Sequence, residues 1–317
     1  MTLAPYYDDL AVGDRFANAP AMTLTSGAAA VHQAIVGDRL PLALDAARAR
    51  DVLGADGQLA HPALVWDVAI GQSTVVTGRV IANLFYRGLV LRRLPLIGDT
   101  LRTTTEVVAL RDSASRPAGL AVLRIRTVDQ HDRPVLDFLR CALLPRRADR
   151  TPPGHDADLA RFEGDLDDGE LRAICAGWRL GRAADGAGDG VAAGARWELE
   201  GGDVVSGAPE LARLTLNVAM AHHDRAVAGG RRLVYGGHTI GIAAAQAARA
   251  VPGLLAIVGW HSCDHVAPVY EGDTLRSEIL VERRDGPLAH LRSLVVAERE
   301  DGTRDRVLDW RFVGVIA

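Results

Sequence analysis

The sequence predicts an α+β protein made of two copies of one unit, in which an antiparallel sheet wraps around a buried central helix. Two observations predict this class. The same motifs occur in the same order in both halves of the 317 residues. Within each half, segments with helical spacing of apolar residues precede segments in which apolar and polar residues alternate. A curved antiparallel sheet can bury one face against such a helix, which gives each unit its core.

The repeat is clearest in the predicted strands. PLIGDTL at 95–101 in the first half corresponds to PVYEGDTL at 268–275 in the second. Each opens an alternating run, and a turn-rich segment, DQHDRP or DGTRD, then leads into VLDF at 135–138 or VLDW at 307–310. Self-similarity at one fixed spacing indicates a duplicated structural unit.

Each half is also predicted to contain two helices. Ser26 and Ser206 precede segments with helical apolar spacing and are candidate N-caps. The segments LAHPALVWDVAIGQ (59–72) and LVYGGHTIGIAAAQ (233–246) lead into longer helices that are apolar on every face. A helix of this kind is normally buried, so these two are the expected central helices.

The repeat divides the chain into an N-terminal unit (1–150), a linker (151–160) and a C-terminal unit (161–317). The sequence RRADRTPPGHDAD, which spans this boundary, is polar and contains proline, as linkers often do. The stretch GRAADGAGDGVAAGA (181–195) is predicted to be a loop, because glycine and alanine offer little surface to pack.

Composition excludes several functions. All 36 basic residues are arginine, against 40 acidic residues, and the formal net charge is -4. Without lysine there is no Schiff-base chemistry and no phosphate-binding GK[ST] loop. A mildly acidic chain without a basic stripe argues against a nucleic-acid partner. The three cysteines are far apart and odd in number, which argues against disulfides and against a thiolate zinc site.

The N-terminal residues are acidic where a signal peptide needs a basic region followed by an apolar one. No apolar stretch approaches the roughly 20 residues needed to cross a bilayer. We therefore expect a cytoplasmic protein without a membrane partner. A homodimer is plausible, because most oligomers pair identical chains.

The repeated motifs resemble those of the MaoC-like (hydratase 2) acyl-CoA dehydratases, which have a double hotdog fold. The closest resemblance is to the mesaconyl-CoA hydratase (β-methylmalyl-CoA dehydratase) branch, through GRRLVYGGHTIG and HVAPVYEGDTL. It covers nearly the whole chain outside the linker. It implies a lyase that reversibly hydrates or dehydrates a short or branched enoyl-CoA, with the CoA thioester as substrate and no cofactor.

In this family an aspartate and a histidine five residues later carry the chemistry. In the first half Asp38 is present, but Ala43 stands where the histidine belongs. In the second half Asn217 occupies the aspartate position and His222 follows five residues later. The resemblance implies that the C-terminal unit carries the catalytic site, and that the N-terminal unit has a degenerate site and forms a wall of the acyl pocket.

Hydration of an enoyl thioester requires a base, an acid and hydrogen-bond donors for the enolate oxygen. His222 can exchange protons near neutral pH, whereas Asn217 can only orient water or hold the histidine tautomer. The second acid or base is then His222 itself, or a neighbour such as Asp224 or His223. For the enolate, the start of the second central helix offers backbone N–H groups, of which that of Gly237 is the candidate.

The remaining candidates bind substrate. Arginine forms bidentate hydrogen bonds with phosphate, so an arginine pair beside the YGGH turn is assigned to the CoA phosphates, with Arg92 and Arg93 as a second choice. The predicted substrate-binding residues are Tyr235, Gly236, His61, Arg231 and Arg232.

Structural interpretations stand beside these. His222 and His61 could be hydrogen-bonded structural residues, and His32 and His223 are expected on the surface or on a helix face. In the HSCDH segment, His261 and His265 would point to the same face of a strand but lie too far apart to share a metal ion easily, so no metal site is favoured. Two other functions remain open: an acyl-CoA thioesterase on the same fold, and a non-catalytic acyl-CoA or lipid-binding protein.

Overall fold

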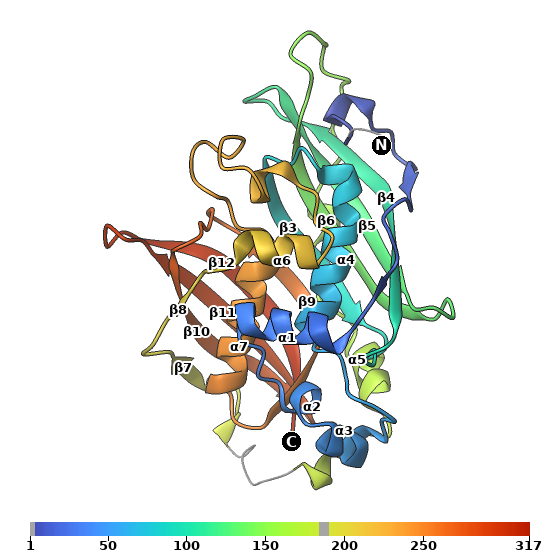
Figure 1. The fold of residues 1–317 in the computed structure, drawn as a ribbon, viewed down its shortest axis with the longest axis vertical. Helices are drawn as coiled ribbons and strands as arrows, with labels where there is room; N and C mark the ends of the chain where they lie inside the picture. The colour runs from blue at the N-terminus through green and yellow to red at the C-terminus, as the bar shows by residue number, and fades with distance from the viewer. Residues whose placement is uncertain (1–3, 184–189) are drawn as a thin grey trace.

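The computed structural model describes residues 4–183 and 190–317. Within these residues twelve strands form one continuous sheet, and the two central helices lie side by side against one of its faces (Figure 1). The strands are β1 (Arg15–Phe16), β2 (Met22–Thr23), β3 (Ala82–Leu91), β4 (Thr100–Asp112), β5 (Ala118–Val128), β6 (Pro134–Pro145), β7 (Arg196–Glu198), β8 (Asp203–Val204), β9 (Leu254–His265), β10 (Thr274–Asp285), β11 (Leu288–Glu298) and β12 (Arg304–Ile316).

The strand order follows the sequence repeat. It runs β1-β4-β5-β6-β3 through the first half and β9-β12-β11-β10-β7 through the second, with β2 paired to β4 and β8 to β10. All pairs are antiparallel, and β3 meets β9 at the centre, where Tyr86 lies opposite Cys263. The sheet therefore crosses from one half to the other without a break.

The helices divide into two central ones and several short ones. The central helices are α4 (Pro62–Thr77) and α7 (Gly236–Ala250), as expected from the sequence. The shorter α-helices are α1 (Ser26–Val36), α2 (Pro41–Leu44), α3 (Ala46–Leu53), α5 (Asp168–Cys175) and α6 (Ala208–Leu214). Single 3₁₀ turns are η1 (Tyr7–Asp9), η2 (Ala160–Phe162), η3 (Leu180–Arg182) and η5 (Met220–His222). None of the described helices is long and apolar enough to span a bilayer.

Neither serine predicted as an N-cap has that role. The cap of α1 is Thr25, whose hydroxyl accepts a hydrogen bond from the Ala28 amide at 3.0 Å, and Ser26 is already the first helical residue. The cap of α6 is Gly207, which has a positive φ of 69° and no side chain to bond. The chain enters α6 through a left-handed turn that favours glycine, and Ser206 precedes this turn.

The core is continuous across the two halves. Trp66 of α4 packs edge-on against Trp260 of β9, with ring centroids 4.8 Å apart, and Trp260 packs on Trp310 of β12 at 5.6 Å. All three side chains are completely buried. Such aromatic contacts stabilise both halves together, because a helix of the first half packs on strands of the second.

Each central helix has a glycine where a segment crosses it closely. A Cβ atom on Gly71 of α4 would lie 1.7 Å from the Thr215 carbonyl oxygen, at the end of α6. A Cβ atom on Gly241 of α7 would lie 3.1 Å from Val36, at the end of α1. The segment after α6 is thus placed by α4, and the segment after α1 packs on α7, so each half positions part of the other.

The predicted linker is an exposed segment between β6 and η2 without α-helix or strand. The predicted loop 181–195 lies partly outside the described residues, and its described residues contain no α-helix or strand.

Candidate active site

A cavity of about 800 Å³ lies between the two halves. Its walls come from β3, β6 and the end of α4 in the first half, and from η5, the start of α7 and the end of β9 in the second. Four residues predicted from the sequence line it together: Asn217, His222, Tyr235 and Gly236.

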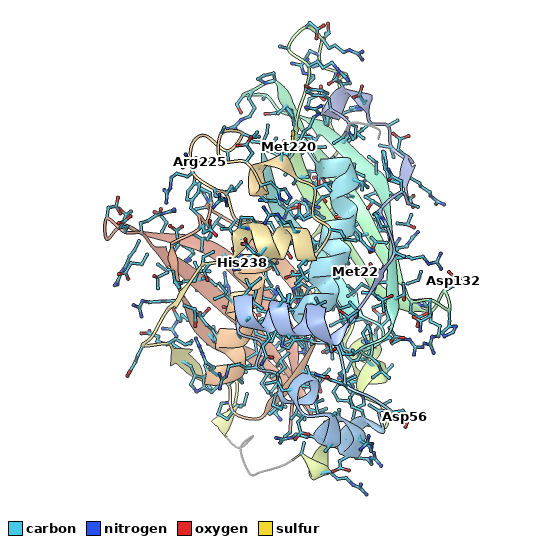
Figure 2. All side chains as sticks on the ribbon, in the orientation of Figure 1. Met22, Asp56, Asp132, Met220, Arg225 and His238 are labelled. Carbon is cyan, nitrogen blue, oxygen red and sulfur yellow. The ribbon has the colours of Figure 1, made fainter. Side chains whose placement is uncertain are left out.

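The segment that carries Asn217 and His222 is anchored to α4. The Val218 amide donates to Thr74 Oγ1 at 2.9 Å, and the Met220 amide donates to the Gly78 carbonyl at 2.9 Å. Figure 2 shows Met220 close to the end of this helix. The first half therefore fixes the position of the candidate catalytic groups of the second.

Asn217 is nearly fully buried and makes three local hydrogen bonds, one of them from its backbone amide to the Ala212 carbonyl at 2.9 Å. Its Oδ1 accepts from the Ala219 amide at 3.0 Å, and its carbonyl oxygen accepts from His223 Nε2 at 2.6 Å. No protein acceptor for its Nδ2 exists in the described chain. Because the residue lines the cavity, this amide is available to donate to a bound molecule.

His222 is held in one tautomer. Its Nδ1–H donates to the Leu233 carbonyl at 2.9 Å, which leaves the lone pair on Nε2. Burial, assisted by the charge of Arg140, lowers its pKa to about 4. The imidazole is therefore neutral at pH 7 and able to accept a proton.

Tyr235 is the N-cap of α7, and its ring lies 5.9 Å from the His222 ring, centroid to centroid. The amides of Gly236 and Gly237 are in the first turn, where an α-helix supplies no acceptor, and no other acceptor for them lies among the described residues. Gly236 lines the cavity. Gly237, the predicted enolate donor, does not line the cavity: it is buried against Tyr235 and Asp67, and a Cβ atom on it would lie 2.1 Å from Asp67 Oδ1. Its contact with an enolate stays a prediction.

His265 is a cavity residue that the sequence interpretation did not assign. Burial lowers its pKa to about 4, with a smaller contribution from Arg140. A Cβ atom on Gly236 would lie 2.5 Å from His265 Nε2, so the glycine allows this ring to reach the start of α7. A neutral histidine beside free helix-start amides is a second group that can hydrogen-bond to substrate.

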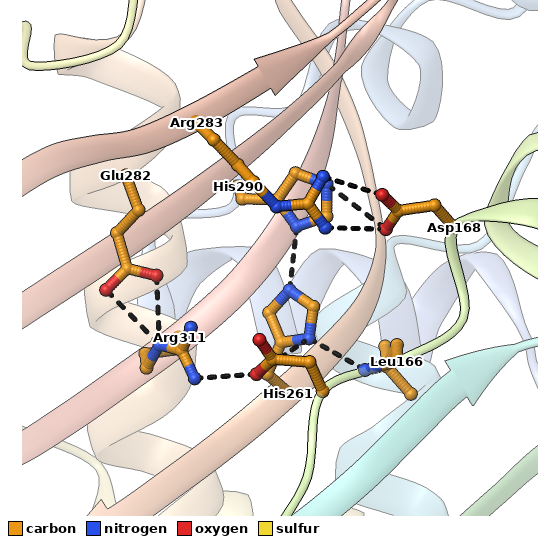
Figure 3. Close-up of polar contacts among 8 residues, drawn as sticks. Leu166, Asp168, His261, Glu282, Arg283, His290 and Arg311 are labelled. Carbon is orange, nitrogen blue, oxygen red and sulfur yellow. Dashed lines mark hydrogen bonds and ion pairs between the residues drawn. The ribbon is translucent and has the colours of Figure 1, made fainter.

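The expectation that His261 and His265 share one face is wrong. The pairing of β9 with β12 shifts register at His261, where Arg311 pairs with Ser262 and Phe312 with Trp260. This bulge turns His261 to the outer face, because one extra residue reverses the side-chain alternation. There His261 donates from Nε2 to His290 Nδ1 at 2.7 Å, inside a cluster of ion pairs (Figure 3).

Arg140 was also missed, although the repeat contains a signal for it. The alternation in β6 places Phe138, Arg140 and Ala142 on the inner face, and all three are buried. In the second half VLDW aligns with VLDF, so the position of Arg140 corresponds to that of Phe312. An arginine in a core register where the other copy has phenylalanine indicates a special role.

The expectation of a surface position for His32 is wrong: it lies on α1 and is completely buried. Its Nδ1 lies 2.6 Å from Asp38 Oδ2, and its Nε2 lies 3.1 Å from Asp67 Oδ2. Burial alone would lower its pKa, but these two carboxylates raise it to about 10. A helical spacing pattern could not show this, because the partner Asp67 lies on another helix.

His61 belongs to the same buried network, with Nδ1 3.0 Å from Asp38 Oδ1, and also within reach of the Ala63 amide. It is not among the residues that line the 800 Å³ cavity. Its predicted contact with substrate therefore has no support in the geometry. The structural interpretation, a buried residue whose Nδ1 caps α4, fits its position better.

Arg231 and Arg232 lie beside the cavity without lining it. Arg231 stacks on the lining residue Tyr270 at 3.9 Å and pairs with Asp273, while Arg232 pairs with Glu271. Their assignment to CoA phosphates stays a prediction. Asp224, considered as a second acid, is exposed and does not line the cavity. His223, the other candidate, uses its Nε2 in the hydrogen bond to the Asn217 carbonyl.

In the part of the chain that the structure describes, no set of three or more histidine, cysteine, aspartate or glutamate side chains could hold a metal ion. All three cysteines are buried and free.

The fold and the shared cavity define a double hotdog protein. A conserved hypothetical protein of Mycobacterium tuberculosis with a double hotdog fold is 49% identical, with a TM-score of 0.89 and 98% of each chain covered. The β-methylmalyl-CoA dehydratase of Chloroflexus aurantiacus is 26% identical over 291 residues, 87% of this chain and 82% of that protein. The mesaconyl-CoA hydratase of Cereibacter sphaeroides is 26% identical over 307 residues, 92% and 88% of the two chains.

No family model matches the sequence. With a relative this similar over 98% of the chain, the protein belongs to the double hotdog family, and its curated relatives are a CoA-ester dehydratase and hydratase of the predicted type.

Proposed function

We propose that this protein reversibly hydrates the double bond of a short or branched enoyl-CoA, as a hydro-lyase. The observation that carries the proposal is one cavity that holds a neutral, tautomer-fixed His222 together with the free amides at the start of α7. The related β-methylmalyl-CoA dehydratase and mesaconyl-CoA hydratase act on substrates of this kind, as their names state.

The residues suggest a sequence of steps. His222 Nε2 takes a proton from water, and the hydroxyl oxygen forms a bond to the β-carbon of the substrate. The electron pair of the double bond moves to the thioester oxygen, where the free amide of the cavity-lining Gly236 stabilises the enolate. The imidazolium then returns its proton to the α-carbon. One water is added and His222 ends neutral.

Asn217 and the N-terminal unit have supporting roles in this proposal. The free Nδ2 of Asn217 orients a bound carbonyl or water. We assign the catalytic groups to the C-terminal unit (161–317) and part of the acyl pocket to the N-terminal unit (1–150). We further propose that the enzyme needs no cofactor, since hydration uses only proton transfer and hydrogen-bond donors, and that it acts in the cytoplasm, as a homodimer.

A direct assay tests the proposal. Crotonyl-CoA and mesaconyl-CoA should each be screened for hydration, with the products resolved by chromatography. His222→Gln should lower kcat/KM by about 100- to 10,000-fold, the usual contribution of a general acid–base group. His131→Gln, in an exposed turn, is the control and should leave activity unchanged. No turnover of any enoyl-CoA, or full activity of His222→Gln, would refute the assignment.

A thioesterase would instead release free CoA, which a thiol reagent detects. That reaction needs a carboxylate or an activated water at the thioester, and no aspartate or glutamate is found among the described residues that line the cavity. A non-catalytic binding protein would bind the thioesters and return them unchanged.

A further inference from the structure

We propose that Arg140 is a specificity-determining residue, which binds a carboxylate on the acyl group of the substrate and so favours acyl groups that carry one over those that do not. This inference rests on the proposed function, because it concerns the same cavity. It adds a specificity-determining residue that the sequence motifs do not contain.

Arg140 is a buried cation without an anionic partner. It is 3% exposed and lines the cavity. Its Nε donates to Asn83 Oδ1 at 2.7 Å and its Nη1 to Ser73 Oγ at 2.8 Å, and both acceptors are neutral. No carboxylate within the described residues forms an ion pair with it. By contrast, the similarly buried Arg299 pairs with both Asp273 and Asp305.

A buried charge without a counter-ion is costly, and a bound anion would offset that cost. The cavity supplies none itself, because its described lining has no acidic side chain. Nor do its histidines compete for an anion, since burial keeps His222 and His265 neutral at pH 7. The Nη2 group of Arg140 has no acceptor in the described protein and remains free for a carboxylate oxygen.

The position of Arg140 favours an acyl carboxylate over a CoA phosphate. The guanidinium is fixed between Ser73 of α4 and Asn83 of β3, on the inner face of the sheet. CoA phosphates carry a polar nucleotide that stays in water, whereas the acyl group enters the buried part of a pocket. Arg79, which is half-buried and also lines the cavity, is better placed for such an outer group.

The fold does not require an arginine here. At the corresponding position of the second half, Phe312 is buried and stacks on Trp310 with ring centroids 4.0 Å apart. An apolar residue therefore satisfies this register of the sheet. The fold therefore does not need the positive charge of Arg140, and no carboxylate among the described residues pairs with it.

The test compares two substrates that differ only at the acyl end: mesaconyl-CoA, which carries a carboxylate, and tiglyl-CoA, which has a methyl group there. Wild type should prefer mesaconyl-CoA. Arg140→Met should lower kcat/KM for mesaconyl-CoA by about 30- to 1,000-fold, the cost of truncating one partner of a buried charge pair, and change tiglyl-CoA by less than about threefold. Arg140→Lys keeps the positive charge but lacks the parallel N–H donors of the guanidinium, so it should retain part of the preference for mesaconyl-CoA over tiglyl-CoA.

Three outcomes separate this inference from the proposed function. Equal use of both substrates by wild type, or an equal loss on both in Arg140→Met, overturns the role of Arg140 while hydration stands. If no enoyl-CoA reacts, the proposed function fails, and calorimetric titration of both thioesters still measures the preference as a ratio of Kd values. Arg140→Gln, which keeps hydrogen-bond donors, replaces Arg140→Met if that variant does not fold.

Discussion

The protonation states of a few buried side chains determine what the cavity can do. His222 and His265 are held neutral by burial, while Arg140 keeps its charge although burial lowers its pKa. The positive charge of Arg140 also disfavours the imidazolium form, so His222 keeps a free lone pair on Nε2 down to about pH 4. The cavity can therefore act as a base at and below neutral pH.

We expect the pH profile of kcat/KM to reflect this. The base form of His222 is required, so activity should fall only as the pH drops through about 4, and should be level across 6.5, where an exposed histidine titrates. Initial rates on mesaconyl-CoA between pH 4 and 8 would show where kcat/KM begins to fall on the acid side. An inflection near 6.5 that disappears in His222→Gln would contradict the burial of this ring.

His32 gives a stability prediction. Its native pKa is about 10, above the value of about 6.5 in an unfolded chain. Its contribution to stability is therefore complete below about pH 6.5 and is lost as the pH rises toward 10. Urea unfolding across this range should show a falling free energy of unfolding for wild type. His32→Gln should lack this component.

At pH 7, His32→Gln should also be destabilised by about 3–5 kcal/mol, because Asp38 and Asp67 lose their shared partner. The exposed His131→Gln is the matched control, with an expected change within about 0.5 kcal/mol. An identical pH slope in wild type and His32→Gln would show that the ring is not charged in the folded protein.

Among the elements, the crossing of α6 over α4 matters most for the site. Gly71 lets the chain at Thr215 approach α4, and hydrogen bonds from Val218 and Met220 continue the contact. The residue between, Leu216, has a positive φ of 59°, which is uncommon outside glycine. The segment is thus held in a specific conformation that delivers Asn217 and His222 to the cavity.

Gly71→Ala should displace this segment. Its Cβ would collide with the Thr215 backbone, and overpacking of this kind costs about 1–3 kcal/mol. Thermal unfolding and kcat should both fall, the latter because the groups at 217–222 shift. Gly27→Ala, on the exposed side of α1 with only an ordinary contact to Thr25, should be neutral or stabilising by up to about 1 kcal/mol. If Gly71→Ala and Gly27→Ala changed thermal stability and kcat equally, the contact of Gly71 with Thr215 would not be what positions this segment.

The molecule as a whole is joined at the β3–β9 pair and at the tryptophan cluster around Trp260. Neither half encloses the cavity alone, since Tyr86 and Arg140 come from the first and His222 and Tyr235 from the second. A second copy of the unit in the same chain therefore does more than double the fold. It completes the site.

We expect a single cooperative unfolding transition, because the sheet and the core cross the boundary between the halves. Calorimetric and van't Hoff enthalpies should agree, and the fragment 161–317 alone should show no hydratase activity. Two resolved transitions, or an active fragment, would show that the halves are independent.

The sequence by itself determined the duplicated architecture and the central helices, because these follow from periodicity and repeated motifs. The resemblance to the MaoC-like dehydratases implied the grouping of Asn217, His222, Tyr235 and Gly236, which line one cavity. Only the tertiary structure decided the surroundings of other polar residues. The bulge that separates His261 from His265, the carboxylate partners of His32 and the unpaired state of Arg140 depend on neighbours from other strands and helices. Burial and pairing are properties of the packed chain, so periodicity along the sequence cannot fix them.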